Sequence, residues 1–417
     1  MIRFIISITS HQSSYIRRFR TCAAGLLLAA LLSPSQARAF VDDGDGLLDV
    51  GEAPGFPADP AAATGGLTLD RRSIQDLDGT NLLTNLQSLG LEYNEVTSIE
   101  TGDFGGLNNL QWLNLEHNKL TSIESGGFIG LTNLQGVNLD YNELASIELD
   151  DFSGLTNLLS LKVRENELTS IELGSFSGLT SLKWIELYGN HLTSIESGNF
   201  SALSNLEEID LEYNELTSVE SGDFSGLPNL RWLILSRNQI TSIESGALAG
   251  LTELRGLYLD TNDLNELDLT QATLHNLIQL FIDSAEIATL RLDDAELSQE
   301  SWETILGETT EVIDASLVGL SFADSSPSDL SSLLSISTLD NVRVDPALYA
   351  LYAAELDAFD AIEGNTVTVV PEPSTLVLIL AGACGLFYRH KYQTEASPSC
   401  RSHDRISWTH SLATIDS

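Results

Sequence analysis

Cysteine is almost absent from this 417-residue sequence. Its three cysteines are Cys22, Cys384 and Cys400, and none lies between residues 40 and 370. That middle part therefore contains no disulfide, no thiolate metal site and no cysteine nucleophile. It is long enough to bury a sizeable apolar core without such cross-links.

Basic residues are also scarce in the middle part. Residues 40–370 contain 11 lysines and arginines against 56 aspartates and glutamates, a net charge of −45. Nucleic acids and anionic lipids carry the same sign of charge, so we expect no nucleic-acid partner. The charge suits cations, basic proteins or neutral glycans, or it serves solubility alone. Because 42% of the sequence is hydrophobic, a folded core is expected.

Residues typical of catalysis are few. The middle part has three histidines, His117, His191 and His275, and none is near a cysteine. Its carboxylates include no pair that stands out for hydrolysis, and no glycine-rich phosphate loop follows a strand pattern. The sequence therefore predicts a protein that is not an enzyme, with no catalytic residues.

The N-terminus has the features of a secretory signal. Arginines at positions 17, 18 and 20 precede the apolar run 23–32, and Ala37-Arg38-Ala39 offers small residues for cleavage. The apolar run is too short to span a bilayer. We predict a signal peptide at residues 1–39 and an acidic leader at residues 40–66. An uncleaved anchor is the alternative.

The leader contains a segment similar to an EF-hand calcium loop. Asp43, Asp45, Asp49 and Glu52 stand at loop positions 3, 5, 9 and 12. Position 1 is Val41, where an acidic ligand belongs. Calcium binding by these four carboxylates is one interpretation, and a flexible acidic leader is the other. No other cofactor is expected.

The C-terminus resembles a bacterial sorting signal. Pro371-Glu372-Pro373 is followed by an apolar segment at residues 376–388 and by the basic cluster Arg389-His390-Lys391. This order resembles the PEP-CTERM signal of Gram-negative bacteria that make exopolysaccharide. The resemblance implies cleavage by an exosortase-type protease and transient anchoring by a transmembrane helix, with the motif and helix at residues 370–391. Unlike that family, the chain continues with a tail at residues 392–417.

An asparagine recurs at regular intervals through the middle part. It occurs with one constant spacing at positions 94, 118, 142, 166, 190, 214, 238 and 262. The surrounding frame, as in Leu110-Gln-Trp-Leu113-Asn-Leu115-Glu-His-Asn118, resembles the leucine-rich repeat. The resemblance implies an α/β repeat fold, a solenoid at residues 67–297 with a parallel β-sheet on its concave face.

Each repeated residue has an expected structural role. Leu113 and Leu115 are two apart, so a strand points both into the core. Asn118 ends the strand, where its amide can bond the backbone of adjoining coils. Phenylalanines recur with the same period from Phe104 to Phe224 and are expected to pack the far side of each coil.

The pattern loosens at both ends of the solenoid. Residues 67–77 look like a truncated first coil in which Arg72 replaces asparagine, and residues 277–285 begin a ninth coil. We predict a divergent α/β capping region at residues 298–369, because terminal coils need caps. Helices are expected to begin near Pro327 and Pro346, and strands are expected at residues 339–344 and 365–370.

The outward strand positions form the candidate binding face. Three of the five tryptophans share one outward repeat position, and aromatic residues with a polar edge commonly anchor interfaces. The candidate ligand-binding residues are the aromatic Trp112, Trp184, Trp232, Tyr93, Tyr141, Tyr188, Tyr213 and Tyr258 and the acidic Glu116, Asp140, Glu186 and Asp210. The alternative is that the large side chains only shield a curved sheet.

A second repeated column consists of glutamates. They occur once per coil at positions 100, 124, 148, 172, 196, 220 and 244. Repulsion between neighbours about 5 Å apart is ~0.8 kcal/mol per pair in water, which a stable fold tolerates. Repeat duplication explains the column as well as cation binding does.

These features predict an exported binding or adhesion protein of the Gram-negative cell surface. It would be anchored at least transiently through its C-terminal helix and bind a protein or a polysaccharide on its concave face. An acidic matrix protein that gathers cations is a second hypothesis. A glycan-acting enzyme with its site in residues 263–370 is a weaker third.

Overall fold

The computed structural model describes residues 56–282, 287–298, 301–302, 304–305, 314–317, 320–322, 330–334, 339, 341–344, 346–362 and 365–370. Six of the predicted features lie outside these residues: the signal peptide, the calcium-loop carboxylates Asp43 to Glu52, the helix start near Pro327, the Pro371-Glu372-Pro373 motif, the apolar segment after it and the tail.

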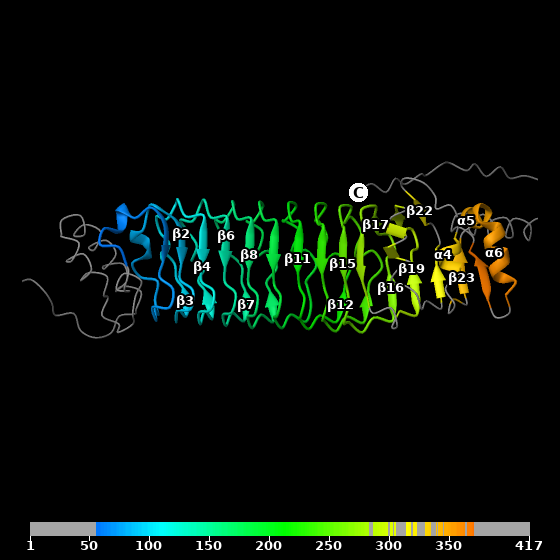
Figure 1. Cartoon of the computed structure of the whole chain (residues 1–417), viewed down its shortest axis with the longest axis horizontal. Coiled ribbons are helices and arrows are strands. Elements are labelled where there is room, and N and C mark those ends of the chain that lie inside the picture. Colours follow the sequence, from blue (N-terminus) through cyan, green and yellow to red (C-terminus); the bar gives the residue numbers. More distant parts are fainter. Residues whose placement is uncertain are drawn as a thin grey trace, which may run out of the picture. The chain divides into compact units, whose positions relative to one another are not determined.

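One strand from each coil contributes to a parallel sheet of ten strands, here called the main sheet. Figure 1 shows these strands side by side along the solenoid. Their bounds are β1 (Gly65–Thr68), β2 (Leu86–Gly90), β4 (Trp112–Asn114), β6 (Gly136–Asn138), β8 (Ser160–Lys162), β10 (Trp184–Glu186), β11 (Glu208–Asp210), β13 (Trp232–Ile234), β15 (Gly256–Tyr258) and β18 (Gln279–Phe281). Leu113 pairs with Val137, its equivalent in the next coil. The predicted parallel solenoid is confirmed.

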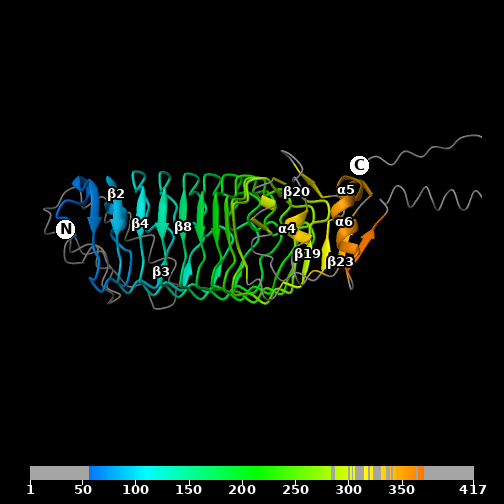
Figure 2. The same cartoon turned by 45° about the vertical axis from the view of Figure 1, so that its right-hand side comes forward.

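Short strands on another side of each coil form a second row. Ser98 pairs with Ser122 and Ser218 with Ser242, again one repeat apart. Figures 1 and 2 show this row away from the main sheet. Its strands are β3 (Ser98–Ile99), β5 (Ser122–Ile123), β7 (Ser146–Ile147), β9 (Ser170–Ile171), β12 (Ser218–Val219) and β14 (Ser242–Ile243).

The repeated asparagines connect the backbones of adjacent coils. The amide of Asn118 donates to the carbonyl of Leu91 at 2.9 Å and to that of Leu115 at 2.9 Å. Its side-chain oxygen accepts from the backbone N–H of Val96 at 3.1 Å. Asn118 is buried, so it satisfies backbone groups that no water reaches. The predicted role of the asparagine is confirmed.

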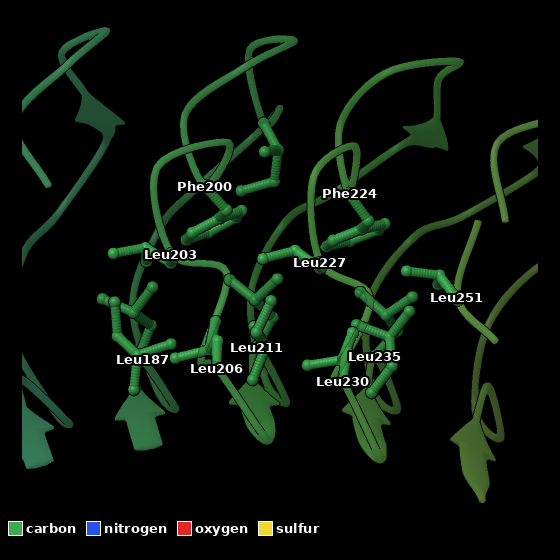
Figure 3. Packing of buried hydrophobic residues seen from close by; sticks show 14 of the residues in the cluster. Leu187, Phe200, Leu203, Leu206, Leu211, Phe224, Leu227, Leu230, Leu235 and Leu251 are labelled. Carbon is green, nitrogen blue, oxygen red and sulfur yellow. The ribbon is translucent and has the colours of Figure 1, made fainter. Parts of the chain in front are cut away.

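The repeated phenylalanines form a continuous buried stack. Ring centroids of Phe104 and Phe128 lie 5.8 Å apart, and those of Phe200 and Phe224 lie 6.2 Å apart. Figure 3 shows Phe200 and Phe224 above the leucines that the two coils contribute at equivalent positions. Because each coil buries its apolar residues against the next, the solenoid core is one cluster along its whole length.

The folded part begins before residue 67. Phe56 is buried in the core, and the short 3₁₀ turn η3 (Pro60–Ala62) leads into β1 at Gly65. The backbone N–H of Arg72 donates to Asn94 at 2.8 Å. Residues 65–77 therefore make the predicted first coil, and a second 3₁₀ turn, η4 (Thr80–Leu82), follows it.

The second row becomes a full sheet toward the C-terminus. Strand β14 contacts the first strand of a parallel five-stranded sheet, which continues past the predicted boundary at residue 297. Its strands are β16 (Glu266–Asp268), β19 (Thr289–Arg291), β21 (Asp314–Ser316), β23 (Asn341–Val344) and β24 (Thr366–Val369). A small third row contains β17 (Thr273–Leu274), β20 (Glu296–Leu297) and β22 (Ser321–Phe322).

Strand β18 is the last strand of the main sheet, and the later coils have helical residues where the earlier coils have a main-sheet strand. Three groups of helical residues alternate with the strands of the five-stranded sheet along the chain. They are residues 301–302 and 304–305, then α4 (Ser331–Leu334), then α5 (Pro346–Leu351) with α6 (Ala353–Asp360). Pro346 is the first residue of α5, as predicted. The predicted strands at residues 339–344 and 365–370 are present as β23 and β24. Residues 331–334 are helical as α4, but the helix start predicted near Pro327 lies outside the described residues.

Candidate ligand-binding face

The outer sheet face comprises the side chains of the main sheet that point away from the core. Along β4, Trp112 is exposed, Leu113 is buried and Asn114 is partly buried. The same alternation recurs in β10, where Trp184 is exposed and Ile185 is buried. Successive residues of a strand point to opposite faces, so the predicted outward positions are the observed ones.

The three tryptophans differ in their exposure. Trp112 is 51% exposed and Trp184 is 38% exposed, whereas Trp232 is partly buried. The indole of Trp112 extends over the next coil, because a Cβ on Gly136 would overlap its Cζ3 and Cε3 atoms. Trp232 extends over Gly256 in the same way. A glycine one repeat later thus makes room for each of these two indoles.

A contiguous aromatic group lies at the end of the main sheet. The ring centroids of Trp232 and Tyr258 are 6.5 Å apart, and those of Tyr258 and Phe281 are 4.9 Å apart. Phe281 is 44% exposed and is not among the predicted site residues. The sequence does carry a signal for it, since Phe281 takes the repeat position of Asn114 in the ninth coil.

The predicted tyrosines near the strand ends fall into two structural groups. Tyr93 and Tyr141 stack on opposite sides of His117, with centroid distances of 4.3 Å on each side. Tyr213 is exposed and lies 6.1 Å from the partly buried Tyr188. All of these residues but Tyr188 have positive φ, a conformation costing roughly 1–2 kcal/mol that ring stacking helps to offset.

Asp140 is not open to a ligand. Its side chain is fully buried, and it accepts hydrogen bonds from the backbone N–H of Arg164 at 2.7 Å and from Nε of Arg164 at 2.9 Å. Arg164 also lies 3.2 Å from Glu186, whose other oxygen lies 2.9 Å from Lys162. The predicted residues Asp140 and Glu186 therefore belong to an ion-pair network at the centre of the face.

Asp210 and Glu208 are acidic residues on β11 that lack an ion pair with any described residue. Burial, with repulsion from Glu212 and Glu186, raises the pKa of Asp210 to about 6. Burial and the nearby Glu186 also raise the pKa of Glu208. Glu208 is not among the predicted site residues, although it stands at the tryptophan position of its coil.

Glu116 binds a neighbouring side chain in the structure. It accepts a hydrogen bond from the amide of Asn138 at 3.0 Å, and Glu92 accepts one from the amide of Asn114 at 2.5 Å. These carboxylate–amide pairs repeat one coil apart. A carboxylate has two oxygens with several acceptor sites, so each pair can still accept a hydrogen bond on the outer sheet face.

The glutamate column has a structural role of its own. Glu124 accepts from the backbone N–H of Thr101 at 3.2 Å, Glu172 from that of Leu149 at 2.9 Å, and Glu244 from that of Ser221 at 3.0 Å. Each of these glutamates bonds to the coil before it. Within the described part of the chain, no group of three histidines, cysteines or acids could hold a metal ion.

Comparison with protein families identifies the repeated segment. A family model for the leucine-rich repeat matches residues 84–144, 132–192, 185–240 and 224–264. Residues 84–264 are leucine-rich repeats. Comparison with curated proteins finds no match.

Several solved structures match this chain. A structure of the TLR13–ssRNA13 complex is 23% identical over 66% of this chain, with a TM-score of 0.49, and the match spans 42% of the TLR13 chain. An internalin (InlF) of Listeria monocytogenes is 21% identical over 67% of this chain and 86% of its own, with a TM-score of 0.36. Internalin C2 of the same organism is 24% identical over 45% of this chain and 77% of its own, with a TM-score of 0.38.

The predicted membrane helix is not among the residues described. In the ranges that are described, no helix is both long and apolar enough to cross a bilayer. The predictions of an anchoring helix and of an exosortase partner therefore depend on the sequence of residues 370–391 alone.

Proposed function

We propose that this chain is an exported binding or adhesion protein of the cell envelope and not an enzyme. Its leucine-rich repeats hold a ligand on the outer sheet face. The observation that carries the proposal is the column of tryptophans at one outward repeat position, two of them more than a third exposed. The part of each indole that remains in water adds no stability to the folded domain.

The architecture of the repeats supports a binding role. Stacked coils create an extended surface on one side of a solenoid, which repeat proteins use for binding. Rigid strands hold the exposed side chains in fixed positions, as a binding surface requires. The acidic charge of the chain disfavours nucleic acid, which leaves protein or polysaccharide as the ligand class.

The sequence supplies the proposed route to the envelope. The signal peptide at residues 1–39 would direct export, and Pro371-Glu372-Pro373 with the apolar segment after it would be read by an exosortase-type protease. The chain would then be anchored at the surface of a Gram-negative cell or released into its matrix. Calcium binding by Asp43, Asp45, Asp49 and Glu52 is a proposal that is independent of this route.

The test compares retention of the full chain on envelope and matrix fractions of the cells that express it. A variant with Trp112, Trp184 and Trp232 all changed to alanine should lose retention. The matched control changes Ile129, Leu149 and Leu173 to alanine, because these residues are also exposed and apolar but lie outside the outer sheet face. Equal retention of the two triple variants would contradict the proposed function.

A further inference from the structure

We propose that the outer sheet face binds a basic protein segment, whose cationic side chain lies over the Glu208 carboxylate between Trp184 and Trp232. This inference rests on the proposed function, since it names the ligand chemistry of the same face. It concerns three adjacent strands, β10, β11 and β13, and one repeat position on each.

The sheet register brings the three side chains together. Trp184 pairs with Glu208, and Glu208 pairs with Trp232. Neighbouring strands are about 4.8 Å apart, so the two tryptophan backbones are about 10 Å apart with Glu208 midway. A cation at Glu208 would thus have a tryptophan on each neighbouring strand, and indole faces attract cations within about 6 Å.

The indole of Trp232 does not lie over Glu208. The indole of Trp232 extends over Gly256, in the direction away from Glu208. We expect the stem of a lysine or arginine side chain to lie beside this indole. Long cationic side chains place such apolar stems along aromatic surfaces while their charge reaches a carboxylate.

The carboxylate that would receive the cation has no counter-ion among the described residues. Lys162 attracts Glu208 electrostatically, but its ammonium is held by Glu186 at 2.9 Å. Burial and the charge of Glu186 raise the pKa of Glu208. Asp210, two residues along β11, is a second part-buried carboxylate without a cation. Burial of two such charges without a counter-ion costs free energy.

The surroundings favour a protein over other cationic polymers. Ile234, on the strand next to Asp210, is apolar, and the aromatic group of Trp232, Tyr258 and Phe281 continues from it. A face with acids beside apolar side chains complements a segment in which basic and apolar residues alternate. Amino polysaccharides carry the charge but present no large apolar groups.

In the experiment, the full chain is titrated with a capped peptide of alternating lysine and leucine, and binding is measured by calorimetry. Glu208→Gln and Trp184→Ala should each weaken binding at least about tenfold, as loss of an interface anchor does. Glu208→Asp keeps the charge and should bind more tightly than Glu208→Gln. Glu143→Gln removes the same charge from an exposed residue outside the face and should bind as the unchanged protein does.

Three outcomes would overturn the inference. The first is equal loss in Glu208→Gln and Glu143→Gln, which would mean general charge attraction. The second is binding of glycol chitosan or dextran without binding of the peptide. The third is a Glu208→Gln variant that binds normally while its melting curve is unchanged. In each case the proposed function would still stand if the triple tryptophan variant lost retention on the envelope fraction.

Discussion

The side-chain oxygen of Asn142 accepts a hydrogen bond from the backbone N–H of Leu120, one coil earlier, at 3.0 Å. The same asparagine donates to the carbonyl of Leu115 at 3.0 Å and to that of Leu139 at 3.0 Å. One buried side chain therefore satisfies three backbone groups on two coils. Asn118 and Asn190 make the same set of bonds in their own coils.

Removal of one such asparagine should destabilise the solenoid. Asn166→Ala leaves the backbone N–H of Leu144 without its partner, and it removes one of the two hydrogen bonds that the carbonyl of Leu139 accepts, the other coming from Asn142. Each unsatisfied buried group costs roughly 1–3 kcal/mol, so we expect a loss of about 2 kcal/mol or more in urea denaturation. Unchanged stability in Asn142→Ala, Asn166→Ala and Asn190→Ala alike would contradict the role of the asparagines.

Gly136→Ala should displace the indole of Trp112 without disturbing the backbone. The added Cβ would overlap Cζ3 and Cε3 of the ring, and the φ of Gly136 is not in the left-handed region. We expect altered near-ultraviolet circular dichroism and tryptophan fluorescence with little change in melting temperature. Gly178→Ala is the control, since a Cβ there meets nothing within 4 Å; equal spectra for the two variants would refute the contact.

Asp103 should make the protein less stable as the pH rises. Burial raises the pKa of Asp103 to about 8, whereas the unfolded value is about 3.9. Between these values the folded chain keeps a proton that the unfolded chain has released, so the free energy of unfolding falls with increasing pH. Asp103→Asn removes this titration. The free energy of unfolding of the variant minus that of the unchanged chain, measured by urea denaturation, should therefore be at least ~2 kcal/mol larger at high pH than at low pH.

The reverse substitution tests the same repeat position. Asn199 stands four repeats after Asp103 and is also buried, so asparagine fits there. Asn199→Asp should destabilise the chain more in mildly alkaline than in mildly acidic buffer, again by chemical denaturation. A pH-independent effect of both substitutions would show that the buried carboxyl is not the cause.

The sorting motif gives a prediction at the C-terminus. In a host with an exosortase, the mature surface protein should lack the residues beyond about Thr375, because two prolines around Glu372 favour the extended backbone that a protease binds. Mass spectrometry of the surface form measures this directly. Recovery of an intact Ser417 on the surface form would exclude processing.

The sequence predicts the main sheet well because one polar residue, the asparagine, marks each turn. It predicts the five-stranded sheet poorly, although the same apolar spacing occurs in Leu264-x-x-Leu267-x-Leu269 and Ile287-x-x-Leu290-x-Leu292. In both segments an alanine, Ala272 or Ala295, is buried where the asparagine would stand. Without the polar marker, the change of sheet from one side of the coils to another is hard to recognise.

The sequence predicts the positions of the candidate site residues but not their contacts. The strand alternation places Trp112 and Trp184 outward from the sequence alone. The alternation within one strand does not show that Arg164 covers Asp140, because the two residues are in different coils. The register between neighbouring coils brings them together. Asp140 and Arg164 occupy the same repeat position in successive coils, which is the signal that predicts such a pair.

The central claim, that the outer sheet face is a binding surface, is tested most directly at Trp184. Trp184 is 38% exposed, so Trp184→Ala should change the melting temperature little and reduce binding to the envelope fraction by ~2 kcal/mol or more. Both quantities are measured on the same purified variant. A lower melting temperature with unchanged binding would show that the indole only shields the sheet, and would contradict the account.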